Sequence, residues 1–430
     1  MSRTPLVEAA TRNDRQLLER ALTGDLGPPH QDDLDEALLG AACHGNAECV
    51  SRLLTQGADV DCEDIDGDTP LMLSSANNHR DVISVLLERG CEVDMTSGRG
   101  RTALHMAVWA GHVSVVQRLL AAGCATDTQE QYDDTALMLA ARSGFVDIMA
   151  ALLHAGCDVT ARNDELDTAL HYAAHHGHAQ CVRMLLAHDV SDDVDPINMW
   201  RKTPLLCAVT QARDEAAMEL IQAGADVTVV DRGIVAWRND PWLARMRRLI
   251  CAVSLRSSGR SALHHAAQHG LCRCLRLLLA RRVCPDVADA DGNTPLMLAT
   301  VHNRPDTVAM LLRDGCHVDI VGHCTIDGQY VWRSPLVVAV ELGHYPIASM
   351  LVQAGSDVND LNGMLFPERA DHAQTQKWLK CIVGVPRALT DICRIVLRRT
   401  LGYDTTAKVT HLPLPPRLLR FLAFGDAVFG

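Results

Sequence analysis

The sequence has little of what marks membrane-spanning, secreted and nucleic-acid-binding proteins. Its 430 residues contain no apolar run near the roughly 18 residues that a spanning helix needs. Acidic side chains occur too early in the first segment for a secretory signal, and no Arg-rich amphipathic transit segment follows. Basic residues are outnumbered, with a formal net charge of −13, whereas nucleic-acid binders are usually basic. We therefore expect a soluble intracellular protein, cytoplasmic with access to the nucleus left open, that binds neither nucleic acid nor membrane.

The sequence also lacks the short motifs of enzymes and metal sites. None of its 16 cysteines forms Cys-x-x-Cys, and they are spread from Cys43 to Cys393. The phosphate-binding Gly-x-x-x-x-Gly-Lys loop, His-Glu-x-x-His and Gly-x-Ser-x-Gly are all missing. An apolar content of 48% is nevertheless normal for a folded chain. We expect a folded, non-catalytic protein without catalytic residues, bound metal or cofactor.

What the sequence does contain is a repeat of 33 residues. A segment of the form Thr-Pro-Leu or Thr-Ala-Leu starts at Thr69, Thr102, Thr135 and Thr168, each 33 residues after the one before. A Leu-Leu-x-x-Gly segment keeps the same phase. Internal repetition at such a period is typical of solenoids. Further copies of the first segment start at Thr203, Ser261, Thr294 and Ser334, and degenerate ones at Glu36 and Thr4.

Each repeat is interpreted as two short helices and a turn. Thr followed by Pro predicts a helix start, because the hydroxyl caps the first turn and Pro lacks an N–H that is not needed there. Leu and Ala at the next positions give that helix a small-residue face, and Gly-His, as at Gly111-His112, ends it. Asp- and Gly-rich segments such as Asp64–Asp68 suit a tight turn. Because no repeat buries its apolar face alone, we expect neighbours to stack into a solenoid.

The repeats resemble the ankyrin repeat. Arg101–Ala107 (RTALHMA) and Asp167–Ala174 (DTALHYAA) both follow the signature heptad of that family. The resemblance implies an all-α solenoid of about nine units over residues 31–360, preceded by a capping or degenerate repeat at 1–30. An insertion at 230–256 interrupts the period, and residues 361–384 are expected to form a linker or cap helix.

Conspicuous Cys and His side chains recur at fixed positions of the repeat. Cys91, Cys124, Cys157 and Cys316 each follow the Gly that ends a second helix. Substitution of one small buried residue for another explains this row better than a metal or disulfide role. His105, His171 and His264 occupy the His position of the signature heptad. The resemblance implies that their imidazoles form hydrogen bonds between neighbouring repeats.

Two segments outside the period are candidates for contact with a partner. Trp242, Met246 and Leu249 recur at helical spacing inside the insertion, with Arg245 among them. We favour a capping helix that packs Trp242 on the stack, and the alternative is a partner-binding surface anchored by Trp and Arg. Residues 326–332 would form an extended finger whose tip contacts a partner. The candidate partner-binding residues are Trp237, Trp242, Arg245, Tyr330 and Trp332.

From residue 385 onward the sequence follows a different pattern. A proline-rich segment, His411–Pro416, separates a first apolar series from a second at Leu418 and Phe421. The first series has helical spacing and therefore predicts an amphipathic helix. It consists of Leu389, Ile392, Cys393, Val396 and Leu397.

Residues 385–430 resemble a SOCS box, the adaptor module of cullin-based ubiquitin ligases. Ala388-Leu389, Cys393 and Leu397 fit the elongin-binding pattern of that module, and Leu412-Pro413-Leu414-Pro415 fits the pattern that selects cullin-5. Two other interpretations stay open: a helix that only caps the last repeat, and a Pro-x-x-Pro ligand of an SH3 domain. The resemblance implies that elongin C is bound by Leu389, Ile392, Cys393, Val396 and Leu397, and cullin-5 by Leu412, Pro413, Leu414, Pro415 and Leu418.

The whole chain is similar to members of the ankyrin repeat and SOCS box family. That resemblance implies a substrate-recognition subunit, whose array binds a protein target of unknown identity. Its SOCS box would bind elongin C with elongin B, and cullin-5 with a RING subunit, leading to ubiquitination and proteasomal degradation of the target. The alternative is a non-degradative ankyrin scaffold or inhibitor whose C-terminal helices only cap the stack. Asn359 also resembles the site of an asparaginyl hydroxylase, although an ordinary turn residue is the simpler interpretation.

Overall fold

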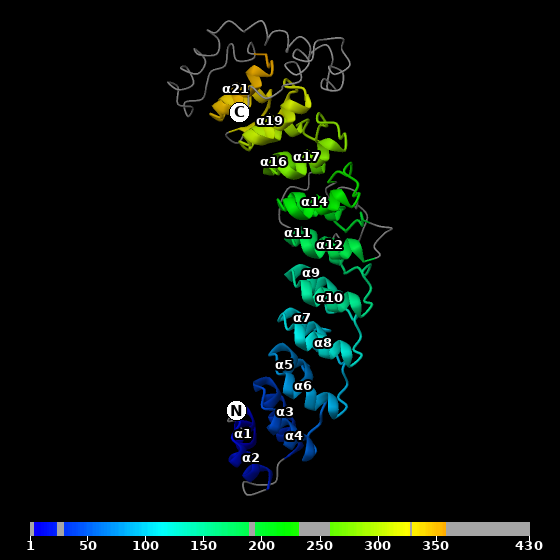
Figure 1. Cartoon of the computed structure of the whole chain (residues 1–430). Helices are drawn as coiled ribbons and strands as arrows, with labels where there is room; N and C mark the ends of the chain where they lie inside the picture. Colours follow the sequence, from blue (N-terminus) through cyan, green and yellow to red (C-terminus); the bar gives the residue numbers. More distant parts are fainter. Residues whose placement is uncertain (1–3, 24–29, 189–193, 232–258, 327–328, 358–430) are drawn as a thin grey trace, which may run out of the picture. The chain divides into compact units, whose positions relative to one another are not determined.

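A computed structural model describes residues 4–23, 30–188, 194–231, 259–326 and 329–357. The chain divides into two compact units, residues 1–199 and residues 200–430, which are described separately. In both units short helices occur in pairs joined by turns, as Figure 1 shows. Most of the predicted insertion and the whole predicted C-terminal module lie outside the described residues.

Unit 1 contains six helix pairs among its described residues. Five of them follow the predicted repeats, and one precedes them at the degenerate copy that starts at Thr4. The pairs are α1 (Pro5–Arg12) with α2 (Arg15–Leu22), α3 (Gln31–His44) with α4 (Ala47–Thr55), α5 (Pro70–Ala76) with α6 (Arg80–Glu88), α7 (Ala103–Trp109) with α8 (Val113–Ala121), α9 (Ala136–Ser143) with α10 (Val146–His154), and α11 (Ala169–His176) with α12 (Ala179–Ala187).

Unit 2 contains four helix pairs and one hairpin among its described residues. The pairs are α13 (Pro204–Thr210) with α14 (Asp214–Gln222), α16 (Ala262–His269) with α17 (Cys272–Ala280), α18 (Pro295–Val301) with α19 (Pro305–Asp314), and α20 (Pro335–Glu341) with α21 (Tyr345–Gln353). From α3 onward the described pairs match the predicted solenoid of ankyrin units, so the fold class is confirmed.

The predicted helix starts are formed by their hydroxyl caps. Thr69 Oγ1 accepts a hydrogen bond from the backbone N–H of Met72 at 3.3 Å, and Thr135 Oγ1 accepts one from Met138 at 3.4 Å. Such a cap satisfies one of the four N–H groups that a helix start leaves without a partner. The predicted stop is formed as well, because Gly177 ends α11 with a φ of 83°, which favours glycine.

Small side chains let the first helices of successive repeats pack closely. Within unit 1 the first helices form one layer, in which each contacts the next: α3, α5, α7, α9 and α11. The second helices form another layer, with contacts between α4 and α6 and along α8, α10 and α12. Ala107, Ala140 and Ala173 are fully buried between the first helices. Unit 2 repeats this arrangement, with α13, α16, α18 and α20 in one layer and α14, α17, α19 and α21 in the other.

Hydrogen bonds between neighbouring repeats add to this packing. His112 Nε2 lies 3.0 Å from the carbonyl oxygen of Ala76 in the previous repeat, and His178 Nε2 lies 3.1 Å from that of Arg142. These are the His residues that follow the helix-ending Gly. Each ring therefore satisfies a carbonyl group that the end of the preceding first helix would otherwise leave unpaired.

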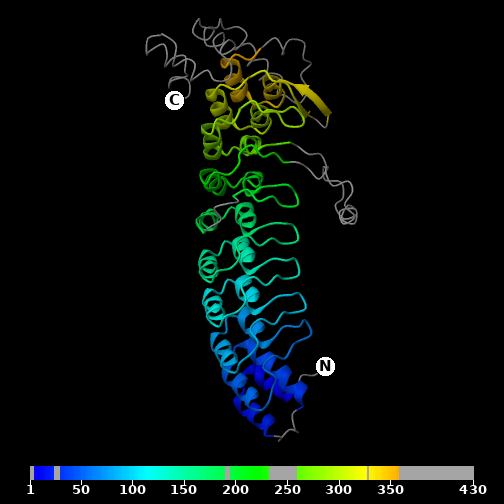
Figure 2. The same cartoon turned by 90° about the vertical axis from the view of Figure 1, so that its right-hand side faces the viewer.

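The turns between repeats are also tied to one another along unit 1. The N–H of Gly98 donates to the carbonyl of Asp66 at 2.9 Å, and the N–H of Gln131 donates to that of Arg99 at 2.9 Å. Figure 2 shows these turns projecting in a row from one side of the helix pairs. Side chains at the tips of consecutive turns are therefore neighbours in space.

The hairpin of unit 2 adds a small sheet to the expected all-α fold. Strand β1 (Gly322–Ile326) pairs antiparallel with β2 (Gln329–Arg333), with Gly322 opposite Arg333. The predicted extended finger, residues 326–332, thus falls mostly on β2. Cys324 packs with Met297 and Val338, so the hairpin is anchored on α18 and α20.

Candidate functional site

The large apolar side chains that unit 1 exposes lie mostly on the tips of its turns. Tyr132, Leu166 and Ile197 are between 44% and 57% exposed, and they sit on consecutive turns. Those turns are joined by backbone hydrogen bonds from Asp164 to Tyr132 at 3.4 Å and from Met199 to Glu165 at 2.9 Å. Exposed apolar groups at adjacent positions mark an interaction surface more strongly than isolated ones. The turn surface is the name used for the five exposed large apolar side chains described in unit 1, with Trp109 at the end of α7 and the others on turns: Ile65, Trp109, Tyr132, Leu166 and Ile197.

Trp109 is held in place on this surface by a charged neighbour. It ends α7 and is 57% exposed, and the guanidinium carbon of Arg101 lies 4.2 Å from the centroid of its ring. Arg101 Nε also pairs with Glu130 Oε2 at 2.6 Å, and both of these side chains are largely buried. Arg101 therefore links two turns and orients an exposed aromatic ring through a cation–π contact. A rigid aromatic group of this kind is a typical anchor for a protein partner.

A buried polar network supports the turns that carry Tyr132 and Leu166. Asn163 Nδ2 donates to Asp134 Oδ1 at 2.8 Å, and the hydroxyl of Tyr172 donates to the same oxygen at 3.0 Å. Burial raises the pKa of Asp134, and the two hydrogen bonds oppose that rise because they favour the carboxylate. The network joins two successive repeats, so it fixes the spacing of the turns that carry Tyr132 and Leu166.

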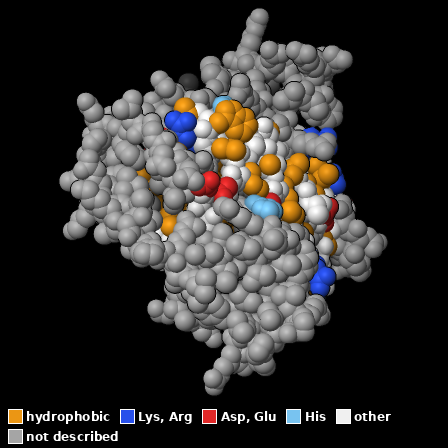
Figure 3. Space-filling view, turned by 90° about the horizontal axis from the view of Figure 1, so that it is seen from above, with side chains coloured by type: hydrophobic (Ala, Val, Ile, Leu, Met, Phe, Trp, Pro, Cys, Tyr) orange, Lys and Arg blue, Asp and Glu red, His pale blue; other side chains and the backbone are white. Residues whose placement is uncertain are grey.

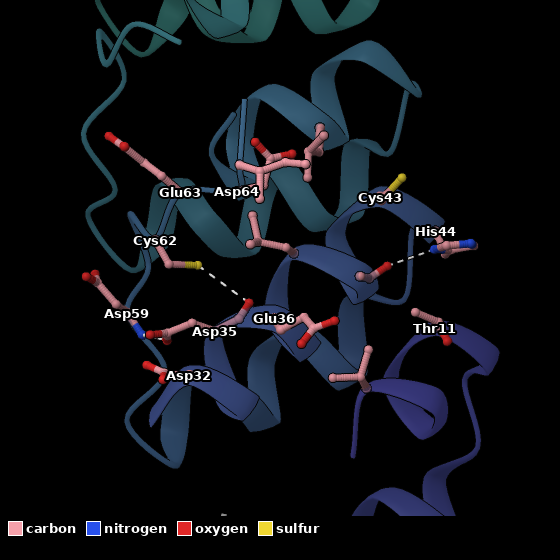
Figure 4. A pocket seen from close by; sticks show the side chains of 15 residues that line it. Thr11, Asp32, Asp35, Glu36, Cys43, His44, Asp59, Cys62, Glu63 and Asp64 are labelled. Carbon is pink, nitrogen blue, oxygen red and sulfur yellow. Dashed lines mark hydrogen bonds between the residues drawn. The ribbon is translucent and has the colours of Figure 1, made fainter. Parts of the chain in front are cut away.

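A hollow of about 830 Å³ lies at the start of the repeats in unit 1. Six carboxylates line it, and no Lys or Arg is among its lining residues. Figure 4 marks the contact between the carboxylate of Asp35 and the backbone of Asp59. Asp35 Oδ1 accepts from the N–H of Asp59 at 2.8 Å, and Asp64 Oδ1 accepts from those of Asp66 and Asp68. These carboxylates shape the turns, which accounts for part of the acidity of the hollow.

In unit 2 the side chain of Trp332 is an exposed aromatic group on the hairpin. Its side chain is 60% exposed, and its ring centroid lies 5.0 Å from that of His323 on β1. Figure 3, which looks from the end where α20 and α21 lie, shows hydrophobic side chains gathered on the described surface with only scattered charged ones. Trp332 is thus a second exposed aromatic position, in a unit described separately from the turn surface.

Most of the predicted site residues lie outside the described residues. Trp332 is exposed on β2, and Tyr330 is on the same strand, opposite Thr325. Contact of either residue with a partner stays a prediction, as do the roles of the site residues outside the described residues. These are Trp237, Trp242 and Arg245 in the insertion, Asn359, and the C-terminal residues Leu389, Ile392, Cys393, Val396, Leu397, Leu412, Pro413, Leu414, Pro415 and Leu418.

The residues of the turn surface were not predicted from the sequence, although a signal for them exists. When the repeats are aligned at 33 residues, Trp109 is in register with Ala76, Arg142 and His175. A bulky aromatic residue at a position that is otherwise so variable indicates a role outside the shared fold. Tyr132 could be found in the same way, because it aligns with Arg99 and Asp66.

The regularly spaced cysteines are buried thiols. Cys91, Cys124, Cys157 and Cys316 are each at most 8% exposed. Burial, with smaller effects from nearby Asp carboxylates, raises the pKa of Cys91 and Cys124 to about 11 and that of Cys157 to about 12. Thiols of this kind stay protonated near neutral pH and react poorly as nucleophiles. Their position agrees with the predicted packing role.

Alkylation should distinguish these thiols from an exposed one. At neutral pH we expect iodoacetamide to modify Cys284, which is exposed, much faster than Cys91, Cys124 or Cys157. Peptide mass spectrometry over a time course measures the rates. In urea the four rates should converge, and equal rates in the folded protein would contradict the packing role.

His264 forms the contact between neighbouring repeats that was predicted for the signature His residues, whereas the buried Nε2 of His105 has no hydrogen-bond partner among the described residues. His264 is fully buried, its Nδ1 lies 2.9 Å from Ser261 Oγ, and its Nε2 lies 3.2 Å from the carbonyl oxygen of Asn293 in the next repeat. Burial lowers the pKa of His264 below its ordinary 6.5, and the charge of Asp289 partly opposes this. The imidazole is therefore a neutral structural group, and it satisfies a carbonyl of the neighbouring repeat.

This burial predicts a loss of stability in acid. As the pH falls through 6.5, the unfolded chain binds a proton at His264 before the folded chain does, so the free energy of unfolding decreases. When the pH is lowered from about 7.5 to about 5.5, we expect the urea concentration at the midpoint of unfolding to decrease. The decrease should be smaller in a His264→Gln variant. An identical fall in both proteins would show that His264 does not contribute.

In the described part of the chain, no group of three or more His, Cys, Asp or Glu side chains is arranged to hold a metal ion. Among the same residues, no helix combines the length and apolar character needed to cross a bilayer.

Comparison with protein families assigns both parts of the chain. The family model for ankyrin repeats in three copies matches residues 6–97, 89–163, 156–231 and 235–321, and the single ankyrin repeat matches residues 332–363. The SOCS box model matches residues 385–423. The ankyrin matches cover well over half of the chain.

Several curated relatives are named for both ankyrin repeats and a SOCS box. Ankyrin repeat and SOCS box protein 11 of Homo sapiens is 29% identical over 167 residues, which is 38% of this chain and 49% of the relative. Ankyrin repeat and SOCS box protein 5 of Mus musculus is 28% identical over 174 residues, 40% of this chain and 50% of the relative. Inversin of Gallus gallus is 36% identical over 119 residues, 28% of this chain and 8% of that protein. The chain spans about half the length of the first two relatives. With ankyrin repeats through most of its length and a SOCS box after them, the chain belongs to the ankyrin repeat and SOCS box family.

Proposed function

We propose that this chain is the substrate-recognition subunit of an elongin B/C–cullin-5–RING ubiquitin ligase. The observation that carries the proposal is the SOCS box match at residues 385–423, which follows the ankyrin array in one chain. The array would bind a target protein, and the SOCS box would recruit the ligase. The target would be ubiquitinated and then degraded, and the chain itself would act as a non-catalytic adaptor.

The pattern of the first half of the SOCS box supports contact with elongin C. Leu389, Cys393 and Leu397 are spaced so that a helix would present them on one stripe. An amphipathic helix with such a stripe binds by laying it into an apolar groove of its partner. The same stripe also includes Ile392 and Val396, which would extend the contact along the helix.

The proline-rich second half supports contact with cullin-5. In His411–Pro416 three prolines restrict the backbone to extended conformations. A segment that is already extended loses little conformational entropy on binding, so it can present Leu412 and Leu414 at low cost. Cullin-5 would then bring a RING subunit and a carrier enzyme charged with ubiquitin.

The turn surface of unit 1 supports the target-binding role. Trp109 and Tyr132 are each 57% exposed and are fixed by a packed scaffold, as anchors for a protein partner usually are. Holding a target there would raise the local concentration of its lysines near the charged carrier. The chain would thus contribute proximity and orientation, while its partners carry out the chemistry.

Co-purification can test the cullin-5 contact of the second half of the SOCS box separately from the elongin contact of the first half. We expect a Leu412→Ala/Pro413→Ala variant to retain elongin B and elongin C but to lose most of its cullin-5 in a co-purification with purified partners. His411→Ala, next to the altered pair but outside the pattern, is the matched control and should retain all three. If the natural chain stays folded and captures neither the elongins nor cullin-5, the C-terminal segment is a cap, and the scaffold function replaces the ligase.

A further inference from the structure

The chain contains almost no lysine. Of its 40 Lys and Arg residues only four are lysines, so arginine carries nearly all of the positive charge. The first 201 residues contain none, although lysine is among the commonest residues of folded proteins. Within the described residues the one lysine is Lys202, which is half-buried and immediately precedes Thr203, the cap of α13. The other three, Lys377, Lys380 and Lys408, lie beyond the described array.

Some of the arginines are required by the fold. Arg260 Nε pairs with Asp289 at 3.0 Å while its Nη1 donates to Gln268 Oε1 at 3.0 Å. Arg281 Nη2 donates to the carbonyl oxygen of Ile221 at 2.8 Å. A forked guanidinium makes two such contacts at once, which a lysine amine does not reproduce. At these positions, packing explains the choice of arginine.

Other arginines have no such reason to be arginine. Arg80 on α6, Arg118 on α8 and Arg276 on α17 are exposed on the second helices of their repeats. Within the described residues their guanidinium groups make no hydrogen bond or ion pair that would select arginine. Lysine and arginine have nearly equal helix propensity and equal charge, so lysine would serve the fold equally well there. The scarcity of lysine therefore has a cause other than folding.

The two side chains differ in the chemistry of ubiquitin transfer. A lysine amine that has lost its proton to water attacks the thioester carbonyl at the end of ubiquitin. The C–N bond forms, the C–S bond breaks, and the thiolate of the carrier leaves and is protonated. A guanidinium keeps its proton and delocalises its electrons, so it does not act as the nucleophile. An array that holds a target beside the charged carrier is itself within reach of that carrier.

We propose that the ankyrin array is an intrinsically poor acceptor of the ubiquitin whose transfer it directs, with Lys202 as the single lysine acceptor between residues 1 and 357. This inference rests on the proposed ligase function. Exposed arginines keep the surface charged without offering an amine. Ubiquitin is thereby directed to lysines of the bound target, and the adaptor is spared from modification of its array.

The test introduces amines without changing the charge. Full-length chain is assembled with elongin B, elongin C, cullin-5, its RING subunit, ubiquitin and the activating and carrier enzymes. Ubiquitin attached to this chain is then mapped by peptide mass spectrometry. The variant is Arg80→Lys/Arg118→Lys/Arg276→Lys, and the matched control is Arg80→Gln/Arg118→Gln/Arg276→Gln, which removes charge but adds no amine. Lys202→Arg tests the remaining acceptor.

The expected result is ubiquitin at Lys202 alone within residues 1–357 of the natural chain, and none there in Lys202→Arg. In the triple Lys variant, incorporation in this range should rise about fourfold, because four amines replace one, and it should not rise in the Gln control. If the complex assembles and transfers ubiquitin elsewhere, for example to cullin-5, while the introduced lysines receive none, the inference is wrong. If the natural chain does not capture the elongins, it is the proposed ligase function that fails.

Discussion

Replacing Leu389 by alanine should weaken the binding of elongin C by about ten- to a hundredfold. Burying one leucine side chain contributes about 1.5–3 kcal/mol, and each loss of about 1.4 kcal/mol lowers an affinity tenfold. Leu389 begins the apolar stripe of the SOCS box, so alanine there removes an anchor of the helix-in-groove contact. Isothermal titration calorimetry of the full-length chain with the purified elongin B–elongin C pair measures the change in affinity.

A substitution on the same predicted helix provides the control. Arg394 lies off the apolar stripe, so Arg394→Ala should leave the affinity within about threefold of that of the natural chain. Circular dichroism before the titration checks that both variants are folded. If Leu389→Ala binds the elongins as tightly as Arg394→Ala, the stripe is not the contact surface, and a capping role for the segment is favoured.

The second large effect is expected in the core of the array. Leu137→Ala should lower the free energy of unfolding by about 2–5 kcal/mol, the usual cost of truncating a fully buried leucine. Leu137 is 1% exposed in α9, which packs between α7 and α11. Because each repeat is stabilised mainly by its neighbours, a cavity there weakens two interfaces at once. Urea unfolding followed by circular dichroism measures the change.

A leucine-to-alanine substitution on the turn surface is the control for Leu137→Ala, because it makes the same chemical change at an exposed position. Leu166 is 45% exposed, so Leu166→Ala should cost less than about 1 kcal/mol. Both leucine and alanine carry a Cβ, so the positive φ of 61° at this position affects them equally. Equal destabilisation by the two variants would contradict the assignment of α9 to the core.

The fold of the array could be predicted because its signals repeat and act locally. Thr69 and Thr135 cap the residues three positions later, and Gly177 ends a helix that lies directly before it, so short sequence windows contain the whole signal. The hairpin of unit 2 was predicted only in part. Residues 326–332 could be identified as an extended finger, but the pairing of β2 with β1 depends on Cys324 packing against α18 and α20. That contact has no local signature.

Trp109 and Tyr132 could be identified by aligning the repeats, but the grouping of the turn surface could not be predicted because its residues meet only after folding. Tyr172 contacts Asp134 across 38 positions of sequence, and Arg101 reaches Trp109 and Glu130 in two different elements. The proximity of these side chains arises from the stacking of successive turns, which the period predicts in outline but not side chain by side chain. The SOCS box residues were identified by their pattern, and their contacts stay predictions.

Assembly of the full-length chain with the elongins tests the central claim most directly. The chain is co-expressed with elongin B and elongin C, and the purified material is analysed by size-exclusion chromatography with light scattering. The adaptor function predicts one stable complex that contains one copy of each protein and that binds cullin-5 when it is added. A folded chain that elutes alone, with the elongins in a separate peak, would contradict that function and favour a non-degradative ankyrin scaffold.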